Sequence, residues 1–273
     1  MARLHFLKSV TDTINTSIIF ETEHSVIVFD GGHRTEAEYL REYLLRLGGH
    51  VDAWFLTHAH DDHVNAIFEI LNNHDDITVD RACYNFSSDE WLESIAPGGE
   101  GITMARCVRK ALNDKSIPID TVQAGDTYTF DGLTIRVLRV PDARVDGRSV
   151  NNASTVFRVE VDGKSIIILG DLDVEGGRQL LELVDPTLLK ADYCQMAHHG
   201  QNGVEREVYE VIRPSYCLWA TPSWLWDNTG DGGYDTGPFQ TLVTRGWISA
   251  MHCVKRHYLM TDGTQIIDLA AQS

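Results

Sequence analysis

The chain has 273 residues, of which 43% are hydrophobic and 23% charged, so it can bury a substantial core and is not intrinsically disordered. Its 23 Lys and Arg residues against 40 Asp and Glu residues give a formal net charge of −17, which argues against binding nucleic acid or anionic membranes through the overall field. Because the chain lacks a long apolar run and its first ten residues lack the features of a signal peptide, we expect a cytoplasmic protein without membrane contact.

The first part of the chain alternates apolar runs with amphipathic stretches. The best-defined stretch is 35–47, whose apolar residues recur with a period near 3.6 and which Gly48 and Gly49 follow as a C-cap, so it should be a helix on a sheet face. Runs rich in β-branched residues predict strands at 17–20, 25–29, 53–56 and 79–86. Further helices are predicted at 64–71 and 102–112.

The rest of the chain is richer in strands. Asp131-Gly132 and Asp162-Gly163 are dipeptides typical of hairpin turns. Strands are expected at 127–130, 133–140, 155–161, 165–169, 193–197, 216–220, 257–261 and 265–269. Helices are expected at 175–184, 204–212 and 239–247. Mixed strands with outer helices, in two similar halves without a linker, predict a layered α/β sandwich formed by a single domain over residues 1–273.

The segment 57–63 (THAHDDH) concentrates ionisable side chains where a predicted strand ends and a predicted helix begins. His58 and His60 can face the same way in an extended chain, and Asp62 and His63 follow as the chain turns into the helix. Imidazoles and carboxylates in this spacing predict two adjacent metal sites. A solvated polar loop is the alternative, but the same groups buried together without a metal would cost roughly several kcal/mol.

His58-x-His60-x-Asp62-His63 resembles the HxHxDH signature of the metallo-β-lactamase-fold hydrolases. Three more segments fit this resemblance in order and spacing, namely 26–32 (VIVFDGG), 166–171 (IIILGD) and 197–200 (AHHG). The resemblance covers nearly the whole chain and implies a four-layer αββα sandwich with its site at the rim between two sheets. With the segment 151–154 (NNAS), the motifs most resemble two branches, the metallohydrolase domain of competence DNA-uptake channels and the phosphorylcholine esterases. Both branches imply phosphodiester chemistry.

The resemblance implies a ligand set for two metal ions. His58 and His60 would bind the first ion, and Asp62 and His63 the second. Asp171 would bridge the two ions, because a pair of cations about 3.5–4 Å apart needs an anion between them. Asp173 is the less favoured bridge.

Further roles follow from the same resemblance. Of the two histidines before Gly200, His199 is expected to bind the second ion, while His198 would be a general acid or lie next to the ligands; the reverse order stays open. Asp62 is expected to take part in catalysis as well as in binding. Asp30 would support the ligands from behind.

Two positions are less determined. Asn152 would support the site or contact substrate. His33 could hold a substrate oxygen, or it could simply be exposed at the start of a helix.

One ligand of the family pattern is missing. Many members carry a further histidine for the first metal before the bridging aspartate, but 75–197 contains no histidine. The segment 141–154 offers Asp142, Asp146, Asn151 and Asn152 in that place. We therefore expect unequal metal sites, the first being the weaker.

The tryptophans Trp219, Trp224 and Trp226 lie close in sequence to Asp227, Asp231 and Asp235. Aromatic faces with carboxylates can bind a cationic group such as choline, but core packing beside a solvated loop is the favoured explanation. Five cysteines without paired spacing (Cys83, Cys107, Cys194, Cys217 and Cys253) are expected to be small buried side chains rather than disulfides or zinc ligands.

Together these features predict a dinuclear metal-dependent hydrolase that uses a metal-bound hydroxide, with a small phosphodiester as the substrate implied by the resemblance. Imidazole and carboxylate ligands without thiolates favour two Zn²⁺ ions, with Mn²⁺ or iron as alternatives. Hydrolysis of a lactone or β-lactam, or metal binding without catalysis, are the rival interpretations. A nucleic-acid partner is not expected, and the sequence says nothing about an oligomeric partner.

Overall fold

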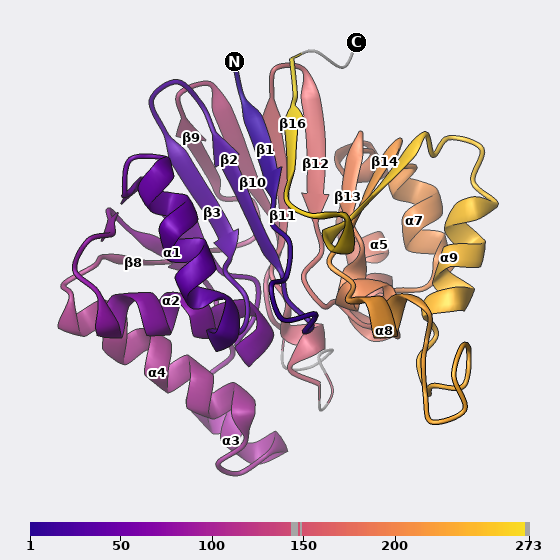
Figure 1. The fold of residues 1–273 in the computed structure, drawn as a ribbon, viewed down its shortest axis with the longest axis horizontal. Helices are drawn as coiled ribbons and strands as arrows, with labels where there is room; N and C mark the ends of the chain where they lie inside the picture. The colour runs from indigo at the N-terminus through magenta and orange to yellow at the C-terminus, as the bar shows by residue number, and fades with distance from the viewer. Residues whose placement is uncertain (143–146, 148, 271–273) are drawn as a thin grey trace.

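Two seven-stranded sheets face each other in the computed structural model, and helices cover the outer face of each sheet (Figure 1). The structure describes residues 1–142, 147 and 149–270. The four-layer αββα sandwich expected from the sequence is confirmed.

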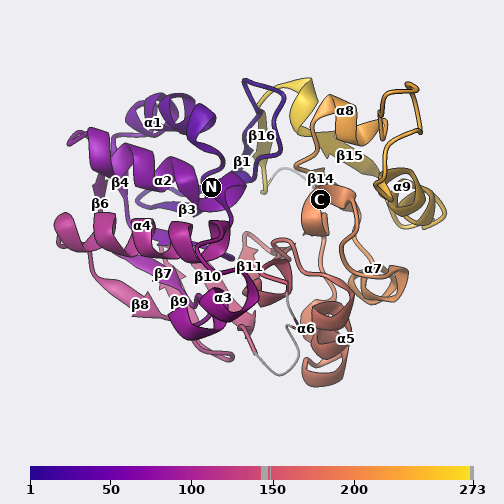
Figure 2. The ribbon, with the colours of Figure 1, turned by 90° about the horizontal axis from the view of Figure 1, so that it is seen from below.

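The first sheet comes from the N-terminal part of the chain plus the last strand. Its strands in spatial order are β16 (Gln265–Asp268), β1 (Arg3–Phe6), β2 (Ser17–Glu21), β3 (Val26–Asp30), β5 (Ala53–Phe55), β7 (Ala82–Tyr84) and β8 (Ile119–Thr121). Around it lie the 3₁₀ turn η1 (Arg34–Glu36) and the helices α1 (Ala37–Arg46), α2 (Asp61–Asn73), α3 (Asp89–Ile95) and α4 (Glu100–Asp114). The view from below shows α2 between α1 and α4 (Figure 2). A small separate ladder pairs β4 (His50–Val51) with β6 (Thr78–Val79).

The second sheet comes from the C-terminal part. Its strands in spatial order are β15 (Arg256–Leu259), β14 (Tyr216–Trp219), β13 (Tyr193–Gln195), β12 (Lys164–Ile168), β11 (Val156–Val161), β10 (Leu133–Arg139) and β9 (Thr127–Phe130). The helices of this part are α5 (Val174–Leu183), α6 (Pro186–Leu189), α7 (Arg206–Ile212), α8 (Ser223–Trp226) and α9 (Thr241–Ser249). Three 3₁₀ turns complete it: η2 (Asn151–Ala153), η3 (Ala197–Gly200) and η4 (Met260–Asp262).

The core between the sheets contains a group of buried aromatic rings. The ring of Phe29 lies 5.7 Å from Phe20, 5.1 Å from Phe55 and 5.4 Å from Phe157, measured between centroids. Phe157 belongs to the second sheet, so these contacts join the two sheets. Such ring pairs stabilise a core beyond the apolar area that they bury.

The sequence-based prediction did not include β1, β8 and α3, and three of its element boundaries differ from the structure. The helix predicted at 64–71 begins at Asp61, which places Asp62 and His63 in its first turn. The strand predicted at 79–86 is divided between β6 and β7, which belong to different sheets. The strand predicted at 193–197 ends at Gln195, because η3 begins two residues later.

The hairpin turn predicted at Asp131-Gly132 is confirmed. Asp131 and Gly132 both have positive φ (41° and 82°) and join β9 to β10 in a hairpin. All five cysteines are free; Cys83, Cys194 and Cys217 are buried as expected, whereas Cys107 and Cys253 are only half-buried. No helix of the described residues is long and apolar enough to cross a membrane.

Candidate metal centre

The predicted ligands meet at one edge of the sandwich, where strands of both sheets end. In the first sheet, β3 and β5 run parallel, so Asp30 and the segment 57–63 emerge at the same edge. In the second sheet, β12 and β13 also run parallel and are followed by Asp171 and His199. The arrowheads of β3 and β12 point to this common edge (Figure 1). Loops after strand ends are where binding residues concentrate in α/β proteins.

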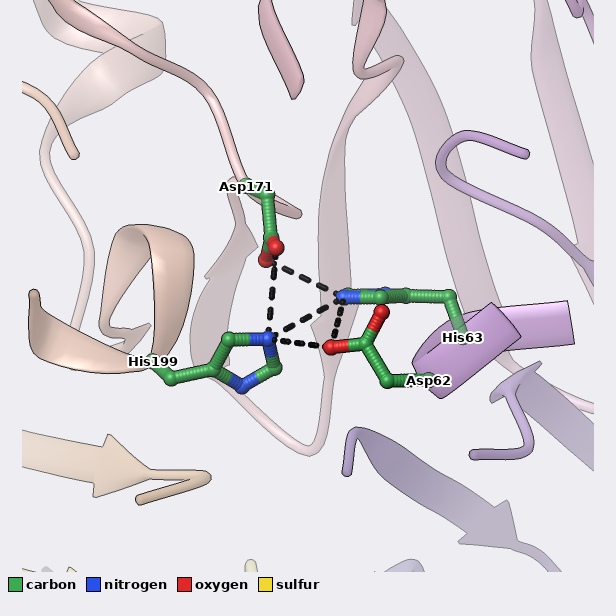
Figure 3. A group of neighbouring side chains, drawn as sticks. All are labelled: Asp62, His63, Asp171 and His199. Atoms are coloured by element: carbon green, nitrogen blue, oxygen red, sulfur yellow. Dashed lines mark hydrogen bonds and ion pairs between the residues drawn. The ribbon is translucent and has the colours of Figure 1, made fainter. Parts of the chain in front are cut away.

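Four side chains form what we call the second donor group: Asp62, His63, Asp171 and His199 (Figure 3). The Nε2 atom of His199 lies 2.9 Å from Asp62 Oδ2 and 3.2 Å from Asp171 Oδ2. The Nε2 atom of His63 lies 3.1 Å from Asp171 Oδ1, and the two Nε2 atoms are 3.4 Å apart. These residues match the set that the resemblance implies for the second metal.

Three side chains form the first donor group: His58, His60 and Asp171. The Nε2 atom of His58 lies 3.1 Å from His60 Nδ1 and 3.8 Å from Asp171 Oδ2. Asp171 belongs to both groups and therefore lies where a bridging carboxylate is expected. The first group offers one side chain fewer than the second, as expected from the missing histidine.

Asp30 orients His63 directly and His58 through Thr57. It is fully buried, and its two oxygens accept hydrogen bonds from the Thr57 amide (2.8 Å), the Thr57 hydroxyl (2.9 Å) and His63 Nδ1 (2.7 Å). The Thr57 oxygen is in turn 3.1 Å from His58 Nδ1. Because these contacts occupy the Nδ1 atoms, the Nε2 atoms of both histidines are directed toward Asp171.

The position of Asp171 depends on a close approach of backbone and side chains. Gly170 has φ +58°, and a Cβ there would lie 2.8 Å from Ser154 Oγ and 2.9 Å from Thr57 Cβ. Ser154 Oγ accepts a hydrogen bond of 3.0 Å from the Asp171 amide. Glycine before Asp171 is therefore a steric requirement, and Ser154 orients the loop.

The second donor group is chemically suited to a cation. His199 donates from Nδ1 to the Ala220 carbonyl (2.9 Å), and His63 donates from Nδ1 to Asp30, so in their neutral forms both Nε2 atoms are acceptors. The Asp171 Oδ1 atom is buried and has no hydrogen-bond donor among the described residues. Acceptors that converge without a donor need either protons or a metal ion between them.

Without a metal, charge pairing within the site shifts the pKa values strongly. Burial alone would lower the pKa of each imidazole, but the carboxylates of Asp171 and Asp62 outweigh it, so the pKa of His63 lies well above its ordinary value and that of His199 rises to about 9. The same contacts hold the pKa of both carboxylates low despite their burial. Burial and the neighbouring His63 lower the pKa of His58 well below its ordinary value.

His198 takes a different orientation from His199. Both residues have left-handed backbone angles (φ 51° and 56°), so the alternation expected of an extended chain does not apply to them. His198 Nδ1 lies 3.3 Å from Asp173 Oδ1, and its Nε2 lies 4.0 Å from Asp171 Oδ2 and 3.2 Å from Asn151 Nδ2. His198 therefore lies beside the donor groups, while Asp173 pairs with it and belongs to neither group.

The two asparagines of the segment 151–154 contact different parts of the molecule. Asn152 Oδ1 accepts hydrogen bonds from the Asp173 and Gly176 amides, both 3.0 Å, so it caps the first turn of α5 instead of lining the cavity. Asn151 lines the cavity, and its Oδ1 is buried without a partner among the described residues. Asp142 lies 3.3 Å from Gln179, in neither donor group, and Asp146 lies outside the described residues.

A cavity of about 440 Å³ opens onto the donor groups. Its lining residues are Asp12, Thr13, Ile14, His33, His60, Asp61, Asp62, Glu100, Asn151, Asp171, His198, His199, Gln201 and Trp224. His33 thus faces the cavity, with its Nε2 atom 3.4 Å from Asp61 Oδ2. Neither Lys nor Arg occurs among the described lining residues.

Sequence reasoning missed part of this lining. Glu100 and the loop of Asp12, Thr13 and Ile14 received no role from the sequence. The only local signal for Glu100 is an acidic residue in the first turn of a helix, after two glycines, and this is common in proteins without any site.

The tryptophan cluster is mostly structural. Trp219 is fully buried against Trp226, with ring centroids 5.1 Å apart. The Arg245 guanidinium lies 3.9 Å above the Trp226 ring and 3.8 Å from Asp227. Only Trp224 lines the cavity among the described members of this cluster.

Comparison with known proteins agrees with this architecture. The profile of the Metallo-beta-lactamase superfamily matches residues 10–214. ComE operon protein 3 of Bacillus subtilis (strain 168) is 30% identical over 169 residues, covering 62% of this chain and 20% of that protein. The matched region is thus only a small part of the relative's length.

Solved structures of low identity share the fold. The metallo-beta-lactamase fold protein YhfI from Bacillus subtilis has a TM-score of 0.56 at 10% identity, covering 98% of this chain and 100% of that chain. The CmlA beta-hydroxylase E377D mutant has a TM-score of 0.59 at 14% identity, covering 98% of this chain and 54% of that chain. Likeness at this level identifies a fold, so the reaction has to be argued from the site.

Proposed function

The chain belongs to the metallo-β-lactamase superfamily, and from this premise we propose that it is a dinuclear metal-dependent hydrolase of a small phosphodiester. The observation that carries the proposal is the pair of donor groups sharing Asp171. Zn²⁺ suits their imidazole and carboxylate donors, with Mn²⁺ or iron as alternatives. As the sequence suggests, we also propose a cytoplasmic location.

In this proposal His58, His60 and Asp171 hold one ion, and Asp62, His63, Asp171 and His199 hold the other. Two bound divalent ions would lower the pKa of a water molecule toward neutrality and offset negative charge on the scissile group. Asp30 and Thr57 orient the imidazoles of His63 and His58, and the cavity admits the substrate.

His198 is the proposed proton donor to the leaving group. Its Nδ1 is held by Asp173 at 3.3 Å, and its Nε2 lies 4.0 Å from Asp171 Oδ2 and 3.2 Å from the side-chain amide of Asn151, whose oxygen can accept from a protonated Nε2 when the amide is turned over. Burial disfavours a charged His198, but the hydrogen bond to Asp173 and the charge of Asp171 raise its pKa. A histidine whose protonated form is stabilised in this way is suited to general acid catalysis.

The size and charge of the cavity favour a small substrate. A volume of about 440 Å³ is typical of small-ligand sites. Without Lys or Arg among its described lining residues, and on a chain of net charge −17, the cavity has nothing to hold the remaining phosphates of a long polyanion. DNA is the rival substrate, supported by the 30% identity with ComE operon protein 3 and the resemblance of the motifs to DNA-uptake proteins.

The test is an activity panel on metal-loaded protein of measured metal content. It compares bis-p-nitrophenyl phosphate, p-nitrophenyl phosphate, a lactone, a chromogenic β-lactam, and plasmid and single-stranded DNA at physiological salt. We expect the phosphodiester to be hydrolysed fastest. Cleavage of DNA with equal or better efficiency, or a preference for the lactone or β-lactam, would show that the substrate assignment is wrong.

The variants Asp62→Ala and His63→Ala should abolish hydrolysis while the fold is retained, as judged by circular dichroism. His24→Ala is the matched control, since His24 is an exposed histidine outside every group of possible metal-binding side chains in the described part of the chain. Unchanged turnover in either site variant contradicts the dinuclear mechanism. Metal binding without hydrolysis of any substrate class would favour a non-catalytic metal-binding module.

A further inference from the structure

Glu100 reaches the candidate metal centre from a helix that carries none of the ligands discussed so far. It lies in the first turn of α4, which packs beside α2. A carboxylate oxygen of Glu100, a ring nitrogen of His60 and a carboxylate oxygen of Asp62 all lie within 4.8 Å of one another. Donor atoms of these three types at such separations can share one metal ion.

One oxygen of Glu100 is already held in place. Its Oε1 atom accepts a hydrogen bond of 2.8 Å from the Asp61 amide. This amide belongs to the first turn of α2, where helical N–H groups have no partner within the helix, and the N-cap residue His60 makes no side-chain hydrogen bond there. The contact therefore fixes the Glu100 carboxylate next to Asp62, and its other oxygen makes no further hydrogen bond among the described residues.

Glu100 lies among carboxyl groups and has no ion-pair partner among the described residues. Asp61, Asp62 and Glu100 place three carboxyl groups around the first turn of α2, and all three line the cavity. Asp62 is paired with His199 and Asp61 lies beside His33, whereas Glu100 is held next to these like charges by a neutral amide donor. A bound cation would give Glu100 a partner of opposite charge.

The first donor group also lacks a ligand. It offers two imidazoles and the shared Asp171, whereas the second group offers four side chains. Asp142 lies elsewhere, with Gln179, and Asn152 caps α5. Glu100 is the carboxylate that lies beside a member of the first group, His60, without being part of either group.

We propose that Glu100 is a metal-binding residue that supplements the first donor group beside His60. This inference rests on the proposed dinuclear function, because it needs an ion at His58 and His60. Glu100 then has two roles, with one oxygen capping α2 at Asp61 and the other available to the metal. It would compensate for the histidine that this chain lacks.

Two substitutions separate these roles. In Glu100→Gln, the amide oxygen can still accept the Asp61 N–H, but the negative charge is lost. In Glu100→Ala, both the hydrogen bond and the charge are lost. Glu90→Gln is the matched control, because Glu90 is an exposed glutamate in the first turn of α3 and its change alters the net charge equally.

The experiment measures the stoichiometry and affinity for Zn²⁺ and Mn²⁺ by calorimetry and chelator competition, and the melting temperature of metal-free protein. We expect Glu100→Gln to melt like the wild type but to bind the weaker of two ions about 10- to 100-fold less tightly, the other ion being unaffected. Glu100→Ala should also melt earlier, because α2 loses its cap. Glu90→Gln should behave like the wild type.

Other outcomes overturn the inference in distinguishable ways. If the wild type binds two ions and Glu100→Gln binds both equally well, Glu100 is only a helix cap and the dinuclear function stands. If Glu90→Gln weakens binding as much as Glu100→Gln, the effect is general electrostatics and Glu100 is not a ligand. If the wild type binds fewer than two ions, the proposed function fails and this inference fails with it.

Discussion

Replacing Asp30 by Asn should move the ring proton of His63, a proposed metal ligand, from Nδ1 to Nε2 without changing the shape of the site. Asp30 has φ +54°, a left-handed conformation that Asn also tolerates, so the backbone is not strained by the change. The two oxygens of Asp30 accept donors from opposite sides, the Thr57 amide at one and His63 Nδ1 at the other. Asn has only one oxygen to offer.

The single oxygen of Asn cannot accept both of the hydrogen bonds that Asp30 accepts. If the Asn oxygen keeps the Thr57 amide, its NH₂ group faces His63 Nδ1 at the place of a 2.7 Å contact, and His63 can relieve the clash only by moving its proton to Nε2. That proton then occupies the position from which Nε2 would bind the second metal. We expect the affinity of the second site to fall about 10- to 100-fold, or about 1.4 to 2.7 kcal/mol. The free energy of unfolding of metal-free protein should fall by about 1–3 kcal/mol.

The assay combines chelator competition, denaturant unfolding of metal-free protein and ¹⁵N NMR of the His63 ring, which reports the tautomer. The control is Asp192→Asn. Asp192 also accepts a backbone amide, from Ser165 at 2.9 Å, and the same oxygen accepts the Ser165 hydroxyl at 3.0 Å, so Asn can keep both contacts, and Asp192 belongs to no donor group. If Asp30→Asn binds both metals as the wild type does, or His63 keeps its proton on Nδ1, the reasoning about Asp30 is refuted.

Three further predictions concern the shared carboxylate, the protons and the glycine of the histidine turn. Asp171→Ala should lose both metals, because Asp171 belongs to both donor groups, and metal analysis that finds both ions retained would identify another bridge. Metal binding at pH 7 should release more than one proton, because the pKa values of His63 and His199 are raised in metal-free protein, that of His199 to about 9. The metal affinity should therefore fall as the pH falls, by about 10-fold per released proton and pH unit. Calorimetry that detects no proton release would contradict this prediction. Gly200→Ala should lower the free energy of unfolding by about 2 kcal/mol or more in denaturant titrations, because φ is +79° and the new Cβ would lie 2.4 Å from a buried tryptophan ring. The control Gly163→Ala has a similar φ of +73° but no atom within 4 Å of the new Cβ, so it should lower the free energy of unfolding by only about 1 kcal/mol. Equal losses in the two variants would contradict the steric argument.

The sequence by itself determined the fold class and identified most of the side chains of the two donor groups. The layered α/β class follows from the alternation of apolar runs and amphipathic stretches, which depends only on local periodicity, and the four-layer αββα order was implied by the resemblance to the family. The spacing from His58 to His63 is equally local, since an extended segment that turns into a helix has few ways to direct these side chains. Asp30, Asp171 and His199 were identified by resemblance to family motifs, and the structure places all three together with the segment 57–63.

Tertiary structure alone decided which neighbours these residues have. Glu100 became part of the site because α4 packs against α2, and nothing in its local sequence indicates that contact. Asn152 was expected at the site, but Asn151 lines the cavity and Asn152 caps α5. This difference depends on the 3₁₀ turn η2, which directs the two side chains to different neighbours. His198 and His199 diverge because two consecutive left-handed residues replaced the extended chain expected there. The physical reason is common to all of these cases: short-range periodicity sets the direction of a side chain within its own element, whereas contacts between elements distant in sequence are set by packing of the whole core.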